Sequence, residues 1–140
     1  MALQTTLAII KPDAVTRKLS GDILKQIEAG GLRPRAIRLL HLTRAQAEAF
    51  YAVHKARPFF NDLCSYMTSG PIIVLALEAD SAIERWRGLM GATDPKQAAA
   101  GTIRMQFGID VEKNATHGSD APETAAKELA FFFSQLEIAP

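Results

Sequence analysis

The chain has 140 residues, which suits a single domain that buries about two thirds of the surface of its unfolded chain. Its apolar fraction of 48% is ordinary for a globular protein, and 16 basic against 15 acidic residues leave a net charge of +1. This balance does not suit a protein that holds nucleic acid mainly by neutralising phosphates, although a local basic cluster is compatible with it.

The cysteine content and the start of the chain indicate a compartment. Cys64 is the only cysteine, so no intrachain disulfide can form and a reducing compartment is expected. Residues 1–4 lack the basic region and long apolar core of a signal peptide, and no apolar run is long enough to span a membrane. We therefore expect a soluble, cytoplasmic protein with one domain over residues 1–140.

The first part of the chain predicts two strands separated by a helix. Residues 6–10 form an apolar run that stops near Pro12, which is typical of a buried strand. Ser20 is suited to cap the next helix, and a Gly-Gly pair ends it. Residues 35–42 predict a second strand, and the proline and arginines in this region favour an edge position.

A helical insert and a central strand follow. Thr43 and Gln46 have capping-box spacing and open a helix that Pro58 ends. Asn61 is expected to cap a short second helix. A continuous apolar run over residues 72–77 predicts a central strand.

Another helix and a long loop come next. Asp80 or Ser81 is expected to cap the helix, which Gly91 ends. Residues 92–114 show little periodicity and predict a long functional loop with a helical turn or two, because loops of this length in a compact domain usually have a function.

The end of the chain completes the topology. Residues 115–119 predict a short last strand, and Asp120 and Glu123 have capping-box spacing at the start of a final helix with Pro122 in its first turn. Without the insert, the first six elements follow the order β-α-β-β-α-β, the ferredoxin-like or split-βαβ plan, which places its helices on one face of the sheet. We predict an α/β fold of the α+β sandwich type, with a four-stranded antiparallel sheet, helices on its faces and a long loop before the last strand.

His117 is the first candidate for chemistry. It lies between a polar, Gly-containing turn and the final helix, near a helix N-terminus where backbone N–H groups and the helix dipole favour anions. A neutral imidazole there can attack a phosphoryl group, so we hypothesise that His117 accepts one. A histidine that only stabilises the fold is the alternative, and it is the commoner role for an arbitrary histidine.

A phosphate site in this chain would have to use side chains. The sequence contains neither a Walker-type Gly-rich loop nor the His-Arg-Asp and Asp-Phe-Gly motifs of protein kinases. Arginine and lysine both bind phosphate oxygens. The candidates lie at or near element ends or in loops, where a solvated surface charge is the commoner role for any single one: Lys11, Arg57, Arg87 and Arg104.

Uncharged and acidic candidates complete this set. Thr93 and Asn114 could bind phosphate or sugar, and Phe59 could stack on a base. Glu128 could turn back toward His117 from the final helix. Turn formation, core packing and an exposed helix carboxylate are the respective alternatives.

Other residues have simpler explanations. Tyr51 and His54 share a helix face that lines either a cleft or the core. The three histidines and Cys64 match no zinc pattern, and Cys64 is more simply a small buried hydrophobe. Trp86 is most simply a core residue.

Six spaced blocks resemble one known family. Lys11-Pro12-Asp13-Ala14 and Asn114-Ala115-Thr116-His117-Gly118-Ser119-Asp120 resemble, in order and separation, motifs of the nucleoside diphosphate kinase family. The resemblance covers nearly the whole chain. Four further blocks also resemble this family: Phe50-Tyr51 to Arg57-Pro58-Phe59-Phe60, Met67-Thr68-Ser69-Gly70-Pro71, Leu89 to Pro95, and Gly101-Thr102-Ile103-Arg104.

The resemblance implies an activity and a set of roles. It implies transfer of the γ-phosphate of a nucleoside triphosphate, typically ATP, to nucleoside diphosphates by a ping-pong mechanism through a phosphohistidine on His117. Magnesium would be held through the nucleotide phosphates, without a protein metal site. Glu128, Ser119 and Lys11 would assist His117. The implied nucleotide-binding residues are Lys11, Tyr51, His54, Phe59, Leu63, Arg87, Thr93, Arg104, Val111 and Asn114.

The chain also departs from the family pattern. Met105-Gln106 stands where a small residue and Asp are common, which bears on loop packing or assembly, and Trp86 replaces a smaller or polar residue and could change how Arg87 is presented. The chain length resembles short bacterial forms, which implies a homo-oligomer, with a tetramer favoured over a hexamer or dimer. A ferredoxin-like RNA-binding module and an inactive family member are the alternatives; the balanced charge disfavours the first, and the presence of His117 disfavours the second.

Overall fold

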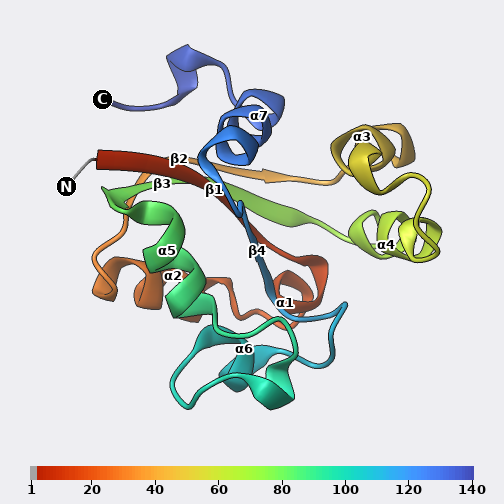
Figure 1. The fold of residues 1–140 in the computed structure, drawn as a ribbon, viewed down its shortest axis with the longest axis horizontal. Coiled ribbons are helices and arrows are strands. Elements are labelled where there is room, and N and C mark those ends of the chain that lie inside the picture. The colour runs from red at the N-terminus through yellow and green to blue at the C-terminus, as the bar shows by residue number, and fades with distance from the viewer. Residues whose placement is uncertain (1–2) are drawn as a thin grey trace.

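The structure is a computed structural model that describes residues 3–140. These residues form a four-stranded antiparallel sheet in the order β2-β3-β1-β4 (Figure 1). Its strands are β1 (Leu3–Ile10), β2 (Arg33–Leu40), β3 (Ile72–Asp80) and β4 (Thr116–Gly118). The ferredoxin-like prediction is confirmed, with β2 at one edge and β3 inside the sheet as expected.

Strand β1 organises the sheet because it pairs with both β3 and β4. Its side chains alternate between two buried clusters: Leu7 and Ile9 lie in one, and Ala8 and Ile10 lie in the other. A strand that is buried on both faces reads as a continuous apolar run, which is why residues 6–10 were recognisable from sequence.

Helices cover both faces of this sheet. Helices α2 (Ser20–Ala29) and α5 (Ala82–Met90) lie on the face of Ala8 and Ile10, as the split-βαβ plan requires. Helix α7 (Pro122–Phe132) covers the opposite face, as Figure 1 shows. The plan's placement of helices on one face therefore holds for α2 and α5 only, because the apolar stripe of α7 packs against the second face.

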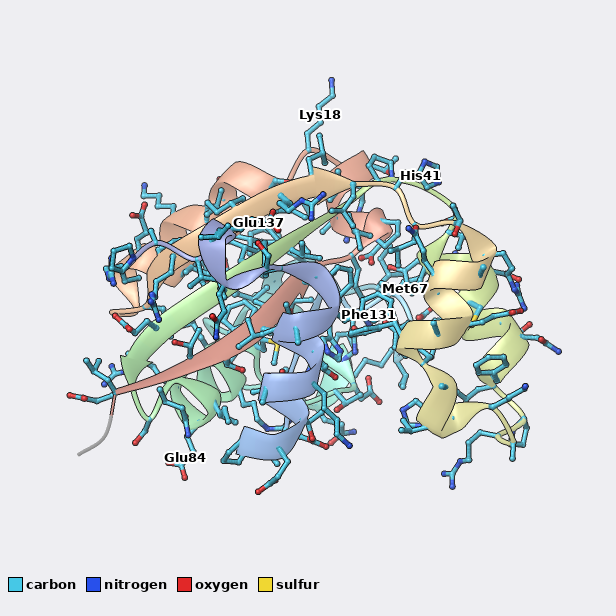
Figure 2. All side chains as sticks on the ribbon, turned by 90° about the horizontal axis from the view of Figure 1, so that it is seen from above. Lys18, His41, Met67, Glu84, Phe131 and Glu137 are labelled. Atoms are coloured by element: carbon cyan, nitrogen blue, oxygen red, sulfur yellow. The ribbon has the colours of Figure 1, made fainter. Side chains whose placement is uncertain are left out.

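The helical insert packs on the same side as α7. Helices α3 (Arg44–Phe50) and α4 (Phe60–Met67) contribute to the buried cluster that contains Phe132. In Figure 2, Met67 lies inside the molecule, whereas Lys18 and Glu84 extend outward. The insert therefore stands beside the end of the sheet, next to α7.

The long loop contains the expected helical turns. They are a 3₁₀ turn (Pro95–Gln97) and helix α6 (Ile103–Phe107). A short helix α1 (Pro12–Thr16) follows β1 directly, and a 3₁₀ turn (Gln135–Glu137) lies near the C-terminus. Among residues 3–140, no helix is both long and apolar enough to cross a bilayer.

Three expected N-caps are wrong. Helix α2 begins at Ser20 itself after Leu19, and α4 begins at Phe60, before Asn61. In both, the preceding residue is already in right-handed helical backbone, so the chain enters from a turn and uses no capping side chain. Helix α7 has Ala121 as its N-cap instead of Asp120, although Pro122 does stand in its first turn.

The other helix ends follow the sequence more closely. Thr43 and Gln46 form the expected capping box. That helix ends at Phe50 and continues as a 3₁₀ turn (Ala52–His54), so it stops before Pro58. Ser81 stands at the start of α5 but makes no side-chain cap bond. Gly91 ends α5 at φ 86°, a conformation that favours glycine.

Candidate active site

Strand β4 presents His117 beside α7. His117 lies opposite Ile9 in the β1–β4 ladder, so its side chain points toward the face that α7 covers. The imidazole is not sealed in the core, because 21% of the side chain is exposed. The ring of Phe50 packs against it nearly edge-on, with 5.7 Å between ring centroids.

A carboxylate fixes one nitrogen of this ring. His117 Nε2 lies 3.0 Å from Glu128 Oε1, and Ser119 Oγ donates a 2.8 Å hydrogen bond to the same oxygen. A carboxylate accepts hydrogen bonds, so this contact assigns the proton to Nε2 and leaves a lone pair on Nδ1. The ring is therefore held in the tautomer in which Nδ1 carries a free lone pair.

Lys11 is held at the end of β1. Its Nζ donates hydrogen bonds to Asn114 Oδ1 at 2.8 Å and to the Glu112 carbonyl at 3.3 Å. Burial, assisted by the nearby charge of Arg104, lowers the pKa of Lys11 to about 8. The ammonium is therefore desolvated and close to a second cation.

Arg104 connects the long loop to β4. Its guanidinium donates to the carbonyls of Gly91 at 3.0 Å and Thr116 at 2.9 Å. Burial and the charge of Arg87 lower the pKa of Arg104 to about 10. Among residues 3–140, its buried Nε has no hydrogen-bond partner. Like charges gathered in this way are typical of an anion site.

Two cavities adjoin these groups. One, of about 430 Å³, is lined by six residues: Lys11, Phe59, Leu63, Thr93, Val111 and Glu112. The other, of about 300 Å³, includes His54 and His117 in its lining. The Phe59 ring is 43% exposed, and Asn114 Nδ2 donates to the Thr93 carbonyl at 3.0 Å. The loop, α4 and the end of β1 thus enclose one apolar cavity with a cation at its end.

Tyr51 and Arg57 occupy positions that the sequence did not specify. Tyr51 is buried beside Phe50, and burial together with the charge of Glu128 raises its pKa. Arg57 is exposed and lies over the Phe59 ring at 5.7 Å. It lines a separate groove, so it does not belong with the other candidate cations.

Comparison with known proteins decides the family. The family model described as nucleoside diphosphate kinase matches residues 4–138. This chain belongs to the nucleoside diphosphate kinase family. The chain is 58% identical to a nucleoside diphosphate kinase of Desulfatibacillum aliphaticivorans (98% of this chain and 99% of that protein) and 55% identical to one of Geotalea uraniireducens (97% and 99%).

Solved structures agree. The Aquifex aeolicus nucleoside diphosphate kinase superposes with a TM-score of 0.97 at 43% identity, covering 99% of this chain and 100% of that one. The Halobacterium salinarum nucleoside diphosphate kinase in complex with CDP gives 0.95 at 38% identity, covering 99% and 93%. This member of the nucleoside diphosphate kinase family is accordingly a phosphotransferase.

Three contacts escaped the sequence analysis of this nucleoside diphosphate kinase. Phe50 packs on the imidazole, and Trp86 donates from Nε1 to the His117 carbonyl at 3.1 Å. At the unusual Met105-Gln106 pair, Gln106 exchanges hydrogen bonds with Gln26 on α2. The departures from the family pattern at Trp86 and Met105-Gln106 were the signals available for two of these contacts, and no local pattern pointed to the contact of Phe50.

Proposed function

We propose that this chain transfers the γ-phosphate of a nucleoside triphosphate, typically ATP, to nucleoside diphosphates through a phosphohistidine on His117. The observation that carries the proposal is the His117–Glu128 hydrogen bond at Nε2, which leaves Nδ1 free. We assign the phosphate to Nδ1. The two nucleotides occupy one pocket in turn, which makes the kinetics ping-pong.

The first half-reaction forms one bond and breaks one. The Nδ1 lone pair attacks the γ-phosphorus as the bond from that phosphorus to the β,γ-bridging oxygen breaks. The nucleoside diphosphate leaves with the bonding electron pair. Glu128 stabilises the positive charge that develops on the imidazole. In the second half-reaction, a terminal oxygen of another nucleoside diphosphate attacks the phosphorus and restores neutral His117.

Cations hold the reacting phosphates. The transition state spreads charge over the equatorial oxygens, so catalysis depends mainly on placement and electrostatics. Lys11, Arg87 and Arg104 would supply positive charge, with Thr93 as a hydrogen-bond donor. The burial of Arg104 and the neighbouring charge of Arg87 support this role, because like charges held together are typical of a site that binds anions. Asn114, with Lys11, would bind near the ribose.

Magnesium is proposed as the cofactor, bound through the nucleotide phosphates. Among residues 3–140, no group of three or more His, Cys, Asp or Glu side chains is placed to hold a metal ion. The oxygen donors that suit magnesium would come mainly from the nucleotide phosphates and water. Bound in this way, magnesium would neutralise phosphate charge.

The apolar cavity is proposed to accept any base. Phe59 offers a ring for stacking, and every base has a π-face, so stacking does not discriminate between bases. Leu63 and Val111 would complete the apolar lining. His54, which lines the cavity of His117, would stand at the phosphate end together with the buried Tyr51. A homotetramer and a cytoplasmic location stay predictions; sedimentation of the purified protein would test the first.

Labelling with ATP tests the proposal. Incubation with magnesium and ATP labelled at the γ-phosphate should give one acid-labile, base-stable phosphate on His117. Addition of any nucleoside diphosphate should discharge it as the triphosphate. His117→Asn should abolish both labelling and turnover while the protein stays folded. Acid-stable label on a serine, or turnover by His117→Asn, would reject the proposed mechanism.

A further inference from the structure

Trp86 contacts the backbone of His117 directly. It is the only tryptophan of the chain, its side chain is fully buried, and it belongs to the core cluster on the α5 face of the sheet. Its indole N–H donates to the His117 carbonyl at 3.1 Å. A buried indole N–H usually takes a hydrogen-bond partner, and here that partner is the backbone of the candidate nucleophile.

The indole and the imidazole lie on opposite faces of the same strand. His117 pairs with Ile9, whose side chain lies in the cluster beside α7. The next residue, Gly118, pairs with Ala8, which shares its cluster with Trp86. Trp86 therefore supports the strand from behind the nucleophile, and Figure 1 shows α5 on the face opposite α7.

Gly118 makes this approach possible. A Cβ on residue 118 would stand 2.6 Å from Cδ1 and 2.7 Å from Nε1 of Trp86. Real Cβ atoms do not come this close to neighbouring atoms, and the indole is fixed inside the core. The indole can therefore reach the His117 carbonyl only because residue 118 has no side chain.

Strand β4 needs such support. It has three residues, lies at the sheet edge and pairs with β1 alone. Short, singly paired elements open with little cost in free energy. Two successive carbonyls of β4 are each held by a side chain: Arg104 donates to Thr116, and Trp86 donates to His117.

We propose that Trp86 is a positioning residue for phosphoryl transfer. Its N–H fixes the backbone of His117 relative to α5, which carries Arg87 as the next residue. The nucleophile and a phosphate-binding cation are thereby held on one rigid support, and alignment of reacting atoms within a fraction of an ångström strongly affects rate. This inference rests on the proposed role of His117.

Two tryptophan analogues isolate the N–H group. Benzothienylalanine at position 86 keeps the fused ring shape and replaces the N–H by sulfur, whereas 5-fluorotryptophan keeps the N–H. In rapid-quench measurements with labelled ATP, we expect the benzothienylalanine protein to phosphorylate His117 about threefold to tenfold more slowly, the equivalent of one hydrogen bond. We expect the 5-fluorotryptophan protein to match the unsubstituted rate, and KM for ATP to change less than twofold in both.

Controls separate positioning from stability. Ile83→Val removes buried volume one turn earlier on α5 and keeps the hydrogen bond from Trp86 to the His117 carbonyl, so it should leave the phosphorylation rate unchanged. Equal phosphorylation rates in the two analogue proteins would overturn the inference and leave the proposed function standing. A benzothienylalanine protein that differs only in a lower melting temperature would do the same. If the unsubstituted protein takes up no phosphate on His117, the proposed function fails and the inference falls with it. A second test uses only natural amino acids. We expect Trp86→Phe to phosphorylate His117 more slowly per folded molecule than Ile83→Val, and equal rates in these two variants would again overturn the inference.

Discussion

Lys11 Nζ donates a 2.8 Å hydrogen bond to Asn114 Oδ1, and this bond joins the end of β1 to the end of the long loop, 103 residues later. The Asn114 amide is itself oriented, because its Nδ2 donates to the Thr93 carbonyl. An ammonium has three donors. Two of them are taken by Asn114 and the Glu112 carbonyl, so one is left to point at a ligand.

The lowered pKa of Lys11 predicts a pH dependence of nucleotide use. With a pKa of about 8, Lys11 carries its charge below that pH and loses it as the pH rises. We expect kcat/KM for ATP to fall above pH 8 by up to about tenfold per pH unit, because this parameter reports the free enzyme. Steady-state kinetics between pH 7 and 9.5 would measure it.

Lys11→Arg provides the control for this profile. A guanidinium stays charged over the whole range, so the variant should show a lower but flat kcat/KM. A fall with the same midpoint in Lys11→Arg would assign the ionisation to another group.

Removal of the Glu128 charge should slow the chemical step. Glu128→Gln keeps the side-chain shape but no longer stabilises a positively charged imidazole, so we expect a loss in the rate of His117 phosphorylation on the order of 10²-fold. Ser119→Ala removes one hydrogen bond to the same oxygen and should cost about threefold to tenfold. Rapid-quench measurements with labelled ATP would give both rates. Glu84→Gln is the control, because Glu84 is an exposed carboxylate on α5. Equal phosphorylation rates in Glu128→Gln and Glu84→Gln would contradict the role assigned to Glu128.

The order and type of the main elements were predictable from sequence because buried strands and amphipathic helices have distinct periodicities. The residues at which the helices begin were harder to predict. Ser20, Asn61 and Asp120 are good capping residues, but the backbone before α2 and α4 continues from a turn and α7 starts at Pro122. A capping residue indicates that a helix is near, whereas tertiary packing decides at which residue it begins.

Candidate site residues could be named from sequence where the proposed chemistry demands a particular residue type, as at His117 and Lys11. It was not predictable where a contact depends on three-dimensional register. Arg57 was one of four candidate cations and lies exposed over Phe59, and Trp86 was expected to be a core residue but also holds the His117 carbonyl. Neither difference is encoded in local spacing, because each depends on which elements meet across the sheet or the insert.

Phe59 should contribute to the binding of every nucleotide alike. Stacking of a base on an aromatic ring is worth about 1–3 kcal/mol, so Phe59→Ala should raise Kd by roughly tenfold to a hundredfold for adenine, guanine, cytosine and uracil nucleotides. Equilibrium titrations with the four diphosphates would measure this. Phe131→Ala is a matched control, since its ring is 40% exposed against 43% for Phe59 and it lies outside the apolar cavity. A loss confined to one base would contradict recognition by stacking.

Substitutions of Arg104 and Arg87 should affect catalysis alike but stability differently. Arg104 donates to the Gly91 and Thr116 carbonyls and is partly buried, whereas Arg87 is exposed on α5. Arg104→Met leaves two carbonyls without donors, so we expect the free energy of unfolding to fall by about 2–4 kcal/mol. For a domain of this size, that loss lowers Tm by roughly 5–10 °C.

Arg87→Met should leave Tm nearly unchanged, because among the described contacts its guanidinium holds no other part of the chain. Both variants remove a charge that is proposed to bind phosphate, so each should lose on the order of 10²–10³ in kcat/KM. Calorimetry and the coupled kinase assay on the same preparations would test both expectations. Equal losses of Tm would show that Arg104 does not anchor the loop to β4, and full activity of Arg87→Met would remove Arg87 from the phosphate site.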